Sequence, residues 1–140
     1  MTTLEEYIIT VDNEKKWIDN FNKNPNSLLL IADMSNTIVG LLFFNPNTKT
    51  KNLHTGEFGV NVHPKYQGLG IGQALIENLL LWARQNDQIE KLFLQVFATN
   101  YKALKLYEKF GFVEEGRHIK AIKQLDGKYV DIIQMYIETK

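Results

Sequence analysis

The segment 60–75 combines three features that together favour binding of an anion. A strand-like pattern is followed at once by a turn containing Gly68, Gly70 and Gly72, and a helical pattern begins directly after it. Backbone N–H groups at the start of a helix have no partner within that helix, and the helix dipole adds positive potential there. Glycines let a phosphate approach those N–H groups without obstruction by a Cβ atom. The spacing therefore predicts a phosphate-binding turn at the start of a helix.

Two other phosphate-binding loops fit this segment less well. A Walker A loop needs Lys and then Ser or Thr after its last glycine, whereas Gln73 and Ala74 follow Gly72 here. A dinucleotide-binding G-x-G-x-x-G turn that began at Gly68 would need its third glycine at position 73. The remaining alternative is a flexible turn whose glycines have no binding role.

Two motifs resemble those of the GNAT family of N-acetyltransferases. Residues 67–72 read Gln-Gly-Leu-Gly-Ile-Gly and are similar to the family signature Q/R-x-x-G-x-G/A. Residues 100–112 read Asn-Tyr-Lys-Ala-Leu-Lys-Leu-Tyr-Glu-Lys-Phe-Gly-Phe and resemble the helix N-x-x-A-x-x-L-Y-x-x-x-G-F. The resemblance extends from Leu28 to the C-terminus. The tail 115–131 looks like that of members that acetylate amino acids or protein N-termini.

The resemblance implies a fold, a cosubstrate and a set of binding residues. The implied fold is α+β, with a mixed, mostly antiparallel twisted sheet that is splayed at its centre and carries helices on both faces. Acetyl-CoA is the implied cosubstrate, and no metal is implied. Backbone groups of Val60, Asn61 and Val62 would pair with the pantetheine amides, and Asn100 would hydrogen-bond the same arm. The pyrophosphate would be held by Gln67, Gly68, Leu69, Gly70, Ile71, Gly72 and Gln73.

Tyr107 matches the family's general acid, which protonates the departing CoA thiolate. A phenol has an ordinary pKa near 10 and is therefore protonated at neutral pH, as an acid for a thiolate must be. An aromatic residue on the apolar stripe of a helix is more often part of the core. The motif favours the catalytic role for this one.

The residue that removes a proton from the attacking amine is harder to assign. An alkyl amine is mostly protonated at neutral pH, so a carboxylate or an ordered water must take a proton from it. Glu57 lies three residues before Val60, where some family members carry a catalytic Glu, and its alternative role is an exposed strand carboxylate. Gln95 occupies the other place where family members carry that Glu, and an amide cannot act as a base.

Length and composition limit what the chain can do. The 140 residues suit a single domain spanning 1–140, with 44% hydrophobic and 23% charged residues. Because the chain has no cysteine, a covalent Cys-acyl intermediate is excluded. We therefore expect direct attack, in a ternary complex, by the primary amine of a small molecule, an amino acid or a peptide N-terminus. The competing hypothesis is a noncatalytic CoA-binding or nucleotide-binding module.

Other partners are disfavoured by charge and residue pattern. Sixteen basic and sixteen acidic residues leave no net charge, which argues against nucleic acid and anionic membranes as partners. No signal-peptide or membrane-spanning pattern is present, so we expect a cytoplasmic protein. The spacing of His54, His63 and His118 fits no metal site. A basic cluster in the C-terminal hairpin is most simply a solvated face, but it might contact an acidic substrate or the CoA 3′-phosphate; its members are Arg117, Lys120, Lys123 and Lys128.

Alternating strand-like and helical periods predict the elements that position these residues. The expected strands are 28–32 and 37–44, joined by a tight turn at Ser35 and Asn36, then 55–62 and 91–97. A helix is expected from Gly70 to about Gln85, and another from Thr99 or Asn100 to a C-terminal cap at Gly111. A polar loop is expected over 45–53, and a hairpin turning at Asp126-Gly127 within 112–137.

The first two dozen residues differ from what the family resemblance implies. They offer one helix, capped by Asp12 and carrying Trp17, Ile18 and Phe21 on one stripe, instead of a strand and two helices. We therefore expect the first strand and a helix of the family fold to be missing or much reduced. The strand 28–32 would then be an edge that needs covering, and a second subunit in a homodimer could cover it.

Overall fold

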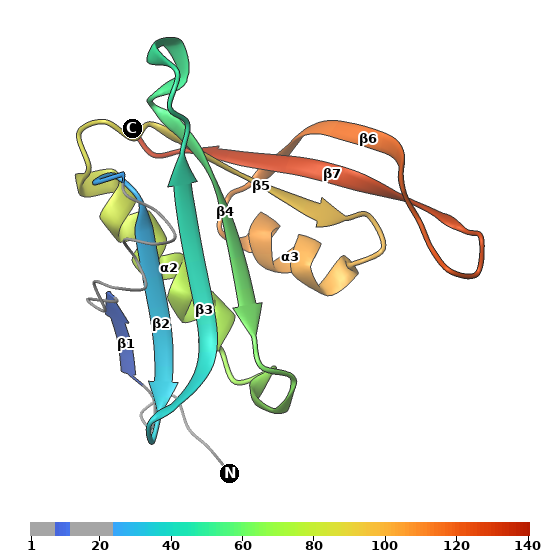
Figure 1. Cartoon of the computed structure of the whole chain (residues 1–140), viewed down its shortest axis with the longest axis horizontal. Coiled ribbons are helices and arrows are strands. Elements are labelled where there is room, and N and C mark those ends of the chain that lie inside the picture. Colours follow the sequence, from blue (N-terminus) through green and yellow to red (C-terminus); the bar gives the residue numbers. More distant parts are fainter. Residues whose placement is uncertain (1–7, 12–23) are drawn as a thin grey trace.

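The described residues form one twisted sheet with two α-helices (Figure 1). The computed structural model describes residues 8–11 and 24–140. The sheet has seven strands among these residues, in the order β1-β2-β3-β4-β5-β7-β6, and only β4 and β5 are parallel neighbours. The expected mixed, mostly antiparallel α+β fold is confirmed. The elements are β1 Ile8–Val11, β2 Leu28–Met34, β3 Thr37–Pro46, β4 Thr55–Val62, α2 Ile71–Gln85, β5 Lys91–Phe97, α3 Tyr101–Lys109, β6 Val113–Lys123 and β7 Tyr129–Glu138, with 3-10 turns at Thr50–Asn52 and Pro64–Tyr66.

The first hairpin confirms the predicted turn and lengthens both strands. Ser35 and Asn36 have φ of 49° and 67°, which suits a two-residue turn of the type that matches strand twist. Because this turn keeps Met34 paired with Thr37, β2 continues past the predicted end at Ala32. The ladder with β4 likewise carries β3 to Pro46, two residues into the predicted loop.

Helices α2 and α3 pack against the same face of the sheet. Phe44 of β3 contacts Trp82 of α2, and Phe58 of β4 contacts Tyr107 of α3. Phe44 and Phe58 are register partners, so their side chains lie on one face. The resemblance implied helices on both faces, whereas the two described helices occupy one face; the helix predicted near the N-terminus lies outside the described residues. No helix in the part of the chain that the structure describes is long and apolar enough to cross a membrane.

Gly56 allows two strands to pass closely where β4 begins, and its replacement tests this packing. A Cβ atom there would lie 2.4 Å from Phe44 Cζ and 2.6 Å from the Asn45 carbonyl oxygen. We expect Gly56→Ala to lower the free energy of unfolding by about 1–3 kcal/mol, the usual cost of overpacking, as measured by urea denaturation. Gly116→Ala is the control, because a Cβ atom there would meet nothing within 4 Å. Equal stability of the two variants would contradict the packing argument.

The sheet splits between β4 and β5 (Figure 1). Their parallel ladder contains only Thr55 with Lys91, Gly56 with Leu92 and Glu57 with Phe93. Beyond that last pair, the residues 58–62 of β4 have no partner strand on the β5 side. Their backbone N–H and C=O groups on that edge are therefore open to an extended ligand.

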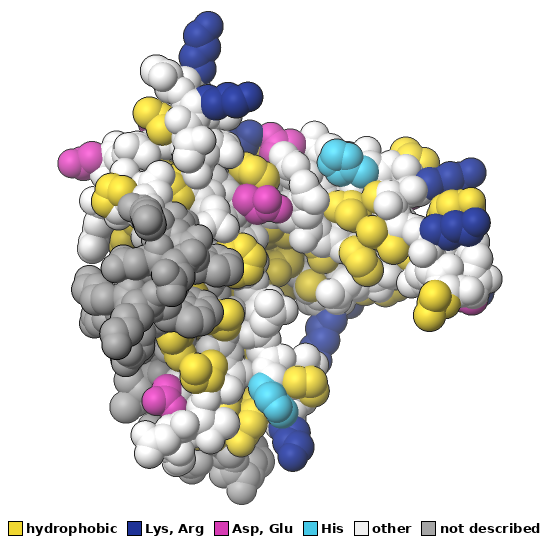
Figure 2. All heavy atoms as spheres, in the orientation of Figure 1, with side chains coloured by type: hydrophobic (Ala, Val, Ile, Leu, Met, Phe, Trp, Pro, Cys, Tyr) yellow, Lys and Arg dark blue, Asp and Glu magenta, His cyan; other side chains and the backbone are white. Residues whose placement is uncertain are grey.

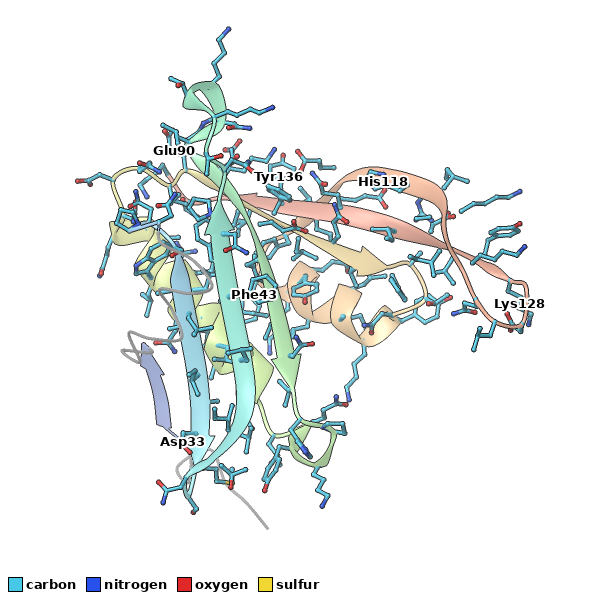
Figure 3. The ribbon with its side chains drawn as sticks, in the orientation of Figure 1. Asp33, Phe43, Glu90, His118, Lys128 and Tyr136 are labelled. Carbon is cyan, nitrogen blue, oxygen red and sulfur yellow. The ribbon has the colours of Figure 1, made fainter. Side chains whose placement is uncertain are left out.

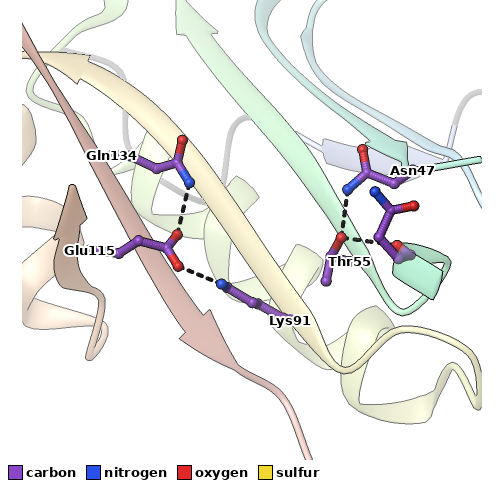
Figure 4. Close-up of polar contacts among 6 residues, drawn as sticks. Asn47, Thr55, Lys91, Glu115 and Gln134 are labelled. Atoms are coloured by element: carbon purple, nitrogen blue, oxygen red, sulfur yellow. Dashed lines mark hydrogen bonds and ion pairs between the residues drawn. The ribbon is translucent and has the colours of Figure 1, made fainter. Parts of the chain in front are cut away.

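Side-chain hydrogen bonds hold both strands where they are still paired (Figure 4). Thr55 of β4 accepts from the Asn47 amide and donates to the Asn52 carbonyl oxygen. Lys91 of β5 pairs with Glu115 of β6, which also accepts from Gln134 of β7. Partial burial alone would raise the pKa of Glu115, but the bonds from Gln134 and Lys91 outweigh it and lower the pKa. Because these bonds fix the paired ends of β4 and β5, the separation of the two strands beyond them is a stable feature of the fold.

The end of α3 confirms the predicted glycine cap. Gly111 has φ of 98°. Its N–H donates to the Glu108 carbonyl at 3.0 Å, and the Phe112 N–H donates to the Tyr107 carbonyl at 3.1 Å, the two bonds of a Schellman motif. Phe112 is thereby buried against Phe58 and Tyr107. The cap therefore fixes the C-terminal half of α3 against β4.

Strands β6 and β7 form a long hairpin that extends away from the rest of the sheet (Figure 1). Gly127 has φ of 85° at the predicted turn, and the Lys128 N–H donates to the Asp126 carboxylate at 2.9 Å. Lys and Arg side chains gather near the tip of this arm (Figure 2). The hairpin prediction is therefore confirmed.

The N-terminal prediction of a much reduced first strand agrees with the structure, but the prediction that strand 28–32 is a sheet edge is wrong. Ile8–Val11 forms β1 and pairs antiparallel with β2 from Leu30 to Asp33. The first strand is thus present, although only four residues long, and β2 is internal to the sheet instead of an edge. The argument that a second subunit must cover β2 is removed. The helix predicted to start at Asp12, with Trp17, Ile18 and Phe21, lies outside the described residues.

Candidate active site

A cleft of about 550 Å³ opens where β4 separates from β5. Its walls come from the end of β4, the glycine-rich turn with the start of α2, and one side of α3. The lining residues are Val60, Val62, Tyr66, Gln67, Gly68, Gly70, Ile71, Gly72, Gln73, Asn100, Lys102, Ala103, Lys105, Leu106, Tyr107 and Lys109. Two motifs about thirty residues apart in the sequence therefore meet in one cavity.

The start of α2 presents backbone N–H groups to this cleft. The helix is capped by Gly70, which has φ of 84° and no side chain to accept a hydrogen bond. Gly68 also has a positive φ, 80°, a conformation that favours glycine. The first N–H groups of the helix, from Ile71 to Gln73, have no carbonyl partner within the helix. This end of the helix can bind an anion through its backbone.

Two glutamine side chains hold the turn in place. The Gln67 amide donates to the Val62 carbonyl oxygen at 3.3 Å, which ties the turn to the end of β4. The Gln73 amide oxygen accepts from Lys109 Nζ at 3.2 Å, which ties the first turn of α2 to the end of α3. Both walls of the cleft are thus linked by side chains.

Asn100 lines the cleft and caps α3. Its Oδ1 accepts a hydrogen bond from the Ala103 N–H at 3.2 Å, which satisfies one of the open N–H groups of the helix. The amide NH₂ group of the same side chain remains available as a donor. Of the two predicted caps, Asn100 and Thr99, the structure uses Asn100.

Tyr107 packs its ring in the core and also lines the cleft. Its ring contacts Phe58 and Phe112 at centroid distances of 6.2 and 6.0 Å, and the residue is only 9% exposed. Burial raises the pKa of the phenol above its ordinary value, because a phenolate is poorly solvated there. The residue is therefore both part of the core and a protonated group lining the cavity.

Glu57 lies at the fork but on the other side of the sheet. It is half-buried and belongs to the last pair before β4 and β5 separate, opposite Phe93. Because Phe58 faces α3, the side chain of Glu57 faces the opposite side. No hydrogen bond or ion pair joins its carboxylate to a described residue.

Most, but not all, of the predicted binding residues line the cleft. Asn61 is exposed on the other side of β4, and Leu69 packs against the core. Both were expected to contribute backbone groups, which a strand and a turn can offer whichever way the side chain points. Gln95 is exposed on β5 outside the cleft.

Three lysines of the cleft were missed by the sequence analysis. Lys102, Lys105 and Lys109 line the wall formed by α3. Their spacing of three and four residues marks one stripe of a helix, a signal that was present in the sequence. Only the fold places this stripe against the start of α2.

The histidines and the C-terminal basic cluster lie elsewhere. Among the described residues no group of three or more His, Cys, Asp or Glu is arranged to hold a metal ion. His63 accepts from the Lys65 N–H and His118 lies on β6 (Figure 3). In the basic cluster, Arg117 pairs with Glu114 and Asp131, and the ammonium groups of Lys120 and Lys123 lie over the Tyr129 ring. None of the four cluster residues lines the cleft.

Comparisons with known proteins show which family and which proteins this chain is similar to. The profile of the acetyltransferase (GNAT) family matches residues 2–112. A spermidine N(1)-acetyltransferase of Vibrio cholerae is 30% identical over 125 residues, which cover 89% of this chain and 70% of that protein. An L-amino acid N-acetyltransferase of Escherichia coli is 26% identical over 123 residues, which cover 88% of this chain and 75% of that protein.

The fold is shared with solved structures. An acetyltransferase of the GNAT family from Streptococcus pneumoniae has a TM-score of 0.82 and 25% sequence identity, covering 89% of this chain and 74% of that one. The likeness thus extends over most of this chain.

Proposed function

The chain belongs to the acetyltransferase (GNAT) family, and from this premise we propose that it transfers the acetyl group of acetyl-CoA directly to a primary amine in a ternary complex. The acceptor would be a small amine, an amino acid or a peptide N-terminus. The protein is an acetyl-CoA-dependent N-acetyltransferase by family. Beyond that family activity, we propose the direct mechanism, the acceptor class and the roles of the individual residues.

One observation carries this proposal: a single cleft connects the open start of α2 with Tyr107 at the fork of the sheet. An extended donor with phosphates at one end and a thioester at the other fits such a cleft. The diphosphate would bind the N–H groups at residues 67–73, and the thioester would lie beside Tyr107. Acetyl-CoA has this arrangement of groups.

The arm between these ends would be held by backbone and amide groups. The open edge of β4 at Val60, Asn61 and Val62 would pair with the pantetheine amides as an added strand does. The NH₂ group of Asn100 would donate to a carbonyl of the same arm. These contacts position the thioester carbon at the gap between β4 and β5.

Transfer then needs one acid and one base. The amine nitrogen bonds to the acetyl carbon, the bond from that carbon to sulfur breaks, and Tyr107 gives its proton to the sulfur. The acceptor ammonium loses one proton before attack, to Glu57 or to a water that it orients. The nitrogen loses its second proton to solvent once the new bond has formed, and the Tyr107 phenolate takes up a proton from solvent. Since Tyr107 and Glu57 face opposite sides of the sheet, donor and acceptor would enter from opposite sides and meet in the gap.

The names of the relatives and the position of Glu57 support a proposal for the acceptor class. The Vibrio cholerae relative is named for spermidine and the Escherichia coli relative for L-amino acids. A carboxylate at the fork favours a cationic amine as the incoming group. We therefore propose a small amine or amino acid as the first class to test, ahead of peptide N-termini.

The direct experiment measures free CoA thiol released from acetyl-CoA in the presence of polyamines, amino acids and short peptides. Thiol release that depends on one amine class, with the acetylated product identified by mass spectrometry, supports the proposal. Tight CoA binding without thiol release above background for any amine would contradict it.

Replacement of Glu57 tests the base. We expect Glu57→Gln to lower kcat/KM for the acceptor by about 10- to 100-fold at neutral pH, within the usual contribution of a general base. The loss should shrink as the pH approaches the pKa of the amine, because deprotonated acceptor then forms without help. The measurement is the pH dependence of kcat/KM.

A matched control is Glu90→Gln, which removes an exposed carboxylate outside the cleft (Figure 3). It should leave the rate unchanged at every pH. If Glu57→Gln behaved like this control, solvent alone would be the base and Glu57 would have no catalytic role.

A further inference from the structure

The wall of the cleft formed by α3 carries more positive charge than a diphosphate needs. The whole chain has no net charge, with 16 basic and 16 acidic residues. The residues that line the cleft nevertheless include Lys102, Lys105 and Lys109 and no Asp or Glu. The cleft is therefore a local cationic site on a neutral protein.

The three lysines differ in how they are engaged. Lys109 Nζ donates to the Gln73 side chain at 3.2 Å, so its charge lies beside the start of α2. Lys102 and Lys105 are exposed, and neither has a hydrogen bond or an ion pair with any residue that the structure describes. Along the helix they lie about 10 and 6 Å from Lys109. Two unpaired cations thus line the cleft at a distance from the diphosphate position.

We propose that Lys102 and Lys105 form a second anion subsite that binds the 3′-phosphate of CoA and selects the donor that carries it. The inference rests on the proposed function, since it assumes that the cleft binds acetyl-CoA. A coenzyme with a diphosphate and a separate phosphate on its ribose fits two positive centres that lie apart. Lys109, joined to Gln73, would remain with the diphosphate. The basic cluster at Arg117 is not needed for this role.

The test compares binding of CoA and 3′-dephospho-CoA by calorimetry. We expect the wild-type protein to bind CoA about tenfold more tightly, since two exposed ion pairs together contribute on that order. In a Lys102→Gln/Lys105→Gln variant the affinity for CoA should fall to that for 3′-dephospho-CoA, while the affinity for 3′-dephospho-CoA stays unchanged. The wild-type preference should also decrease as salt is raised.

A Lys49→Gln/Lys51→Gln variant is the matched control, because it removes two exposed lysines that do not line the cleft. It should keep the wild-type preference for CoA over 3′-dephospho-CoA. That result would show that the loss of two positive charges elsewhere does not change the preference. All four positions are exposed, so the substitutions should not affect folding.

Three results would overturn the subsite. If the Lys102→Gln/Lys105→Gln variant preferred CoA over 3′-dephospho-CoA as strongly as the wild type does, the two lysines would not bind the 3′-phosphate. An equal loss of affinity for both ligands would assign the two lysines to the diphosphate instead. In either case, acetyl transfer by the wild-type protein would leave the proposed function intact. Failure of the wild-type protein to bind CoA at all would overturn the proposed function and the subsite together.

Discussion

Replacing Tyr107 by Phe is expected to lower kcat by about two to three orders of magnitude, the usual contribution of a general acid. The variant keeps the ring that packs on Phe58 and Phe112, so the cleft should keep its shape. It loses the proton donor, and CoA would have to leave as a free thiolate. The KM for acetyl-CoA should change little. Steady-state thiol release with the preferred amine measures both quantities.

Two controls separate chemistry from structure in this experiment. Tyr66→Phe removes another phenol from the same cleft and should keep most of the activity. The thermal midpoint of Tyr107→Phe should equal that of the wild type, because its packing contacts are retained. A wild-type rate for Tyr107→Phe, with either result for Tyr66→Phe, would show that water or another group protonates the sulfur.

The burial of Tyr107 also fixes the sign of the pH dependence. Burial raises the pKa of the phenol above its ordinary value near 10. The acid form is therefore the dominant one throughout the neutral and mildly alkaline range, and the midpoint of its loss should lie at higher pH than that of an ordinary phenol. A fall in kcat below that range would have to come from another group.

The sequence was sufficient for the elements that form from local patterns. Strand 91–97 was predicted at the residues where β5 lies, and Gly111 and the pair Ser35-Asn36 adopt the positive φ values that their turns require. Such features depend on a few neighbouring residues, so periodicity and turn chemistry reveal them. β2 and β3 extend beyond their predicted ends, because the length of a paired strand also depends on its neighbouring strand and not only on its own residues.

The location of the reduced first strand was not predicted, for the same reason. All four residues of Ile8–Val11 are β-branched, which favours a strand. A run of four such residues is too short to predict a strand by itself. It becomes a strand by pairing with β2, a contact between residues about twenty apart in the sequence. Short edge strands are fixed by such partners more than by their own composition.

In the candidate site, too, residues with a local structural role could be predicted from the sequence, and residues placed only by the tertiary fold could not. The motifs indicated Gly68, Gly70 and Asn100, because each residue type answers a local demand of a turn or cap. The lysine stripe of α3 has no such local role. In the sequence, the stripe has the pattern of a solvated helix face. Only the fold places it opposite the start of α2. The position of this stripe in the cleft depends on the tertiary fold, which explains why the sequence analysis, which weighed only the basic cluster of the hairpin, did not single it out.

The glycine turn leads to a prediction in which stability and binding move in opposite directions. Gly72 is the second residue of α2 and lines the cleft. A Cβ atom there would lie 3.6 Å from Val62 Cγ2, which is an ordinary contact, so a side chain fits. The first turn of α2 has no acidic residue. An Asp at this position should stabilise the helix by about 0.3–1 kcal/mol through its dipole.

The same Gly72→Asp change should lower the affinity for acetyl-CoA by about 100-fold or more. Its carboxylate would occupy the N–H groups meant for the diphosphate and repel it, and a like-charge contact costs several kcal/mol. Calorimetry with acetyl-CoA and a thermal melt of the free protein measure the two effects. Gly72→Asn has nearly the same size without the charge, so it should lose much less affinity. If Gly72→Asp bound acetyl-CoA as tightly as Gly72→Asn, the negative charge would not meet a phosphate there, and the start of α2 would not be the diphosphate site.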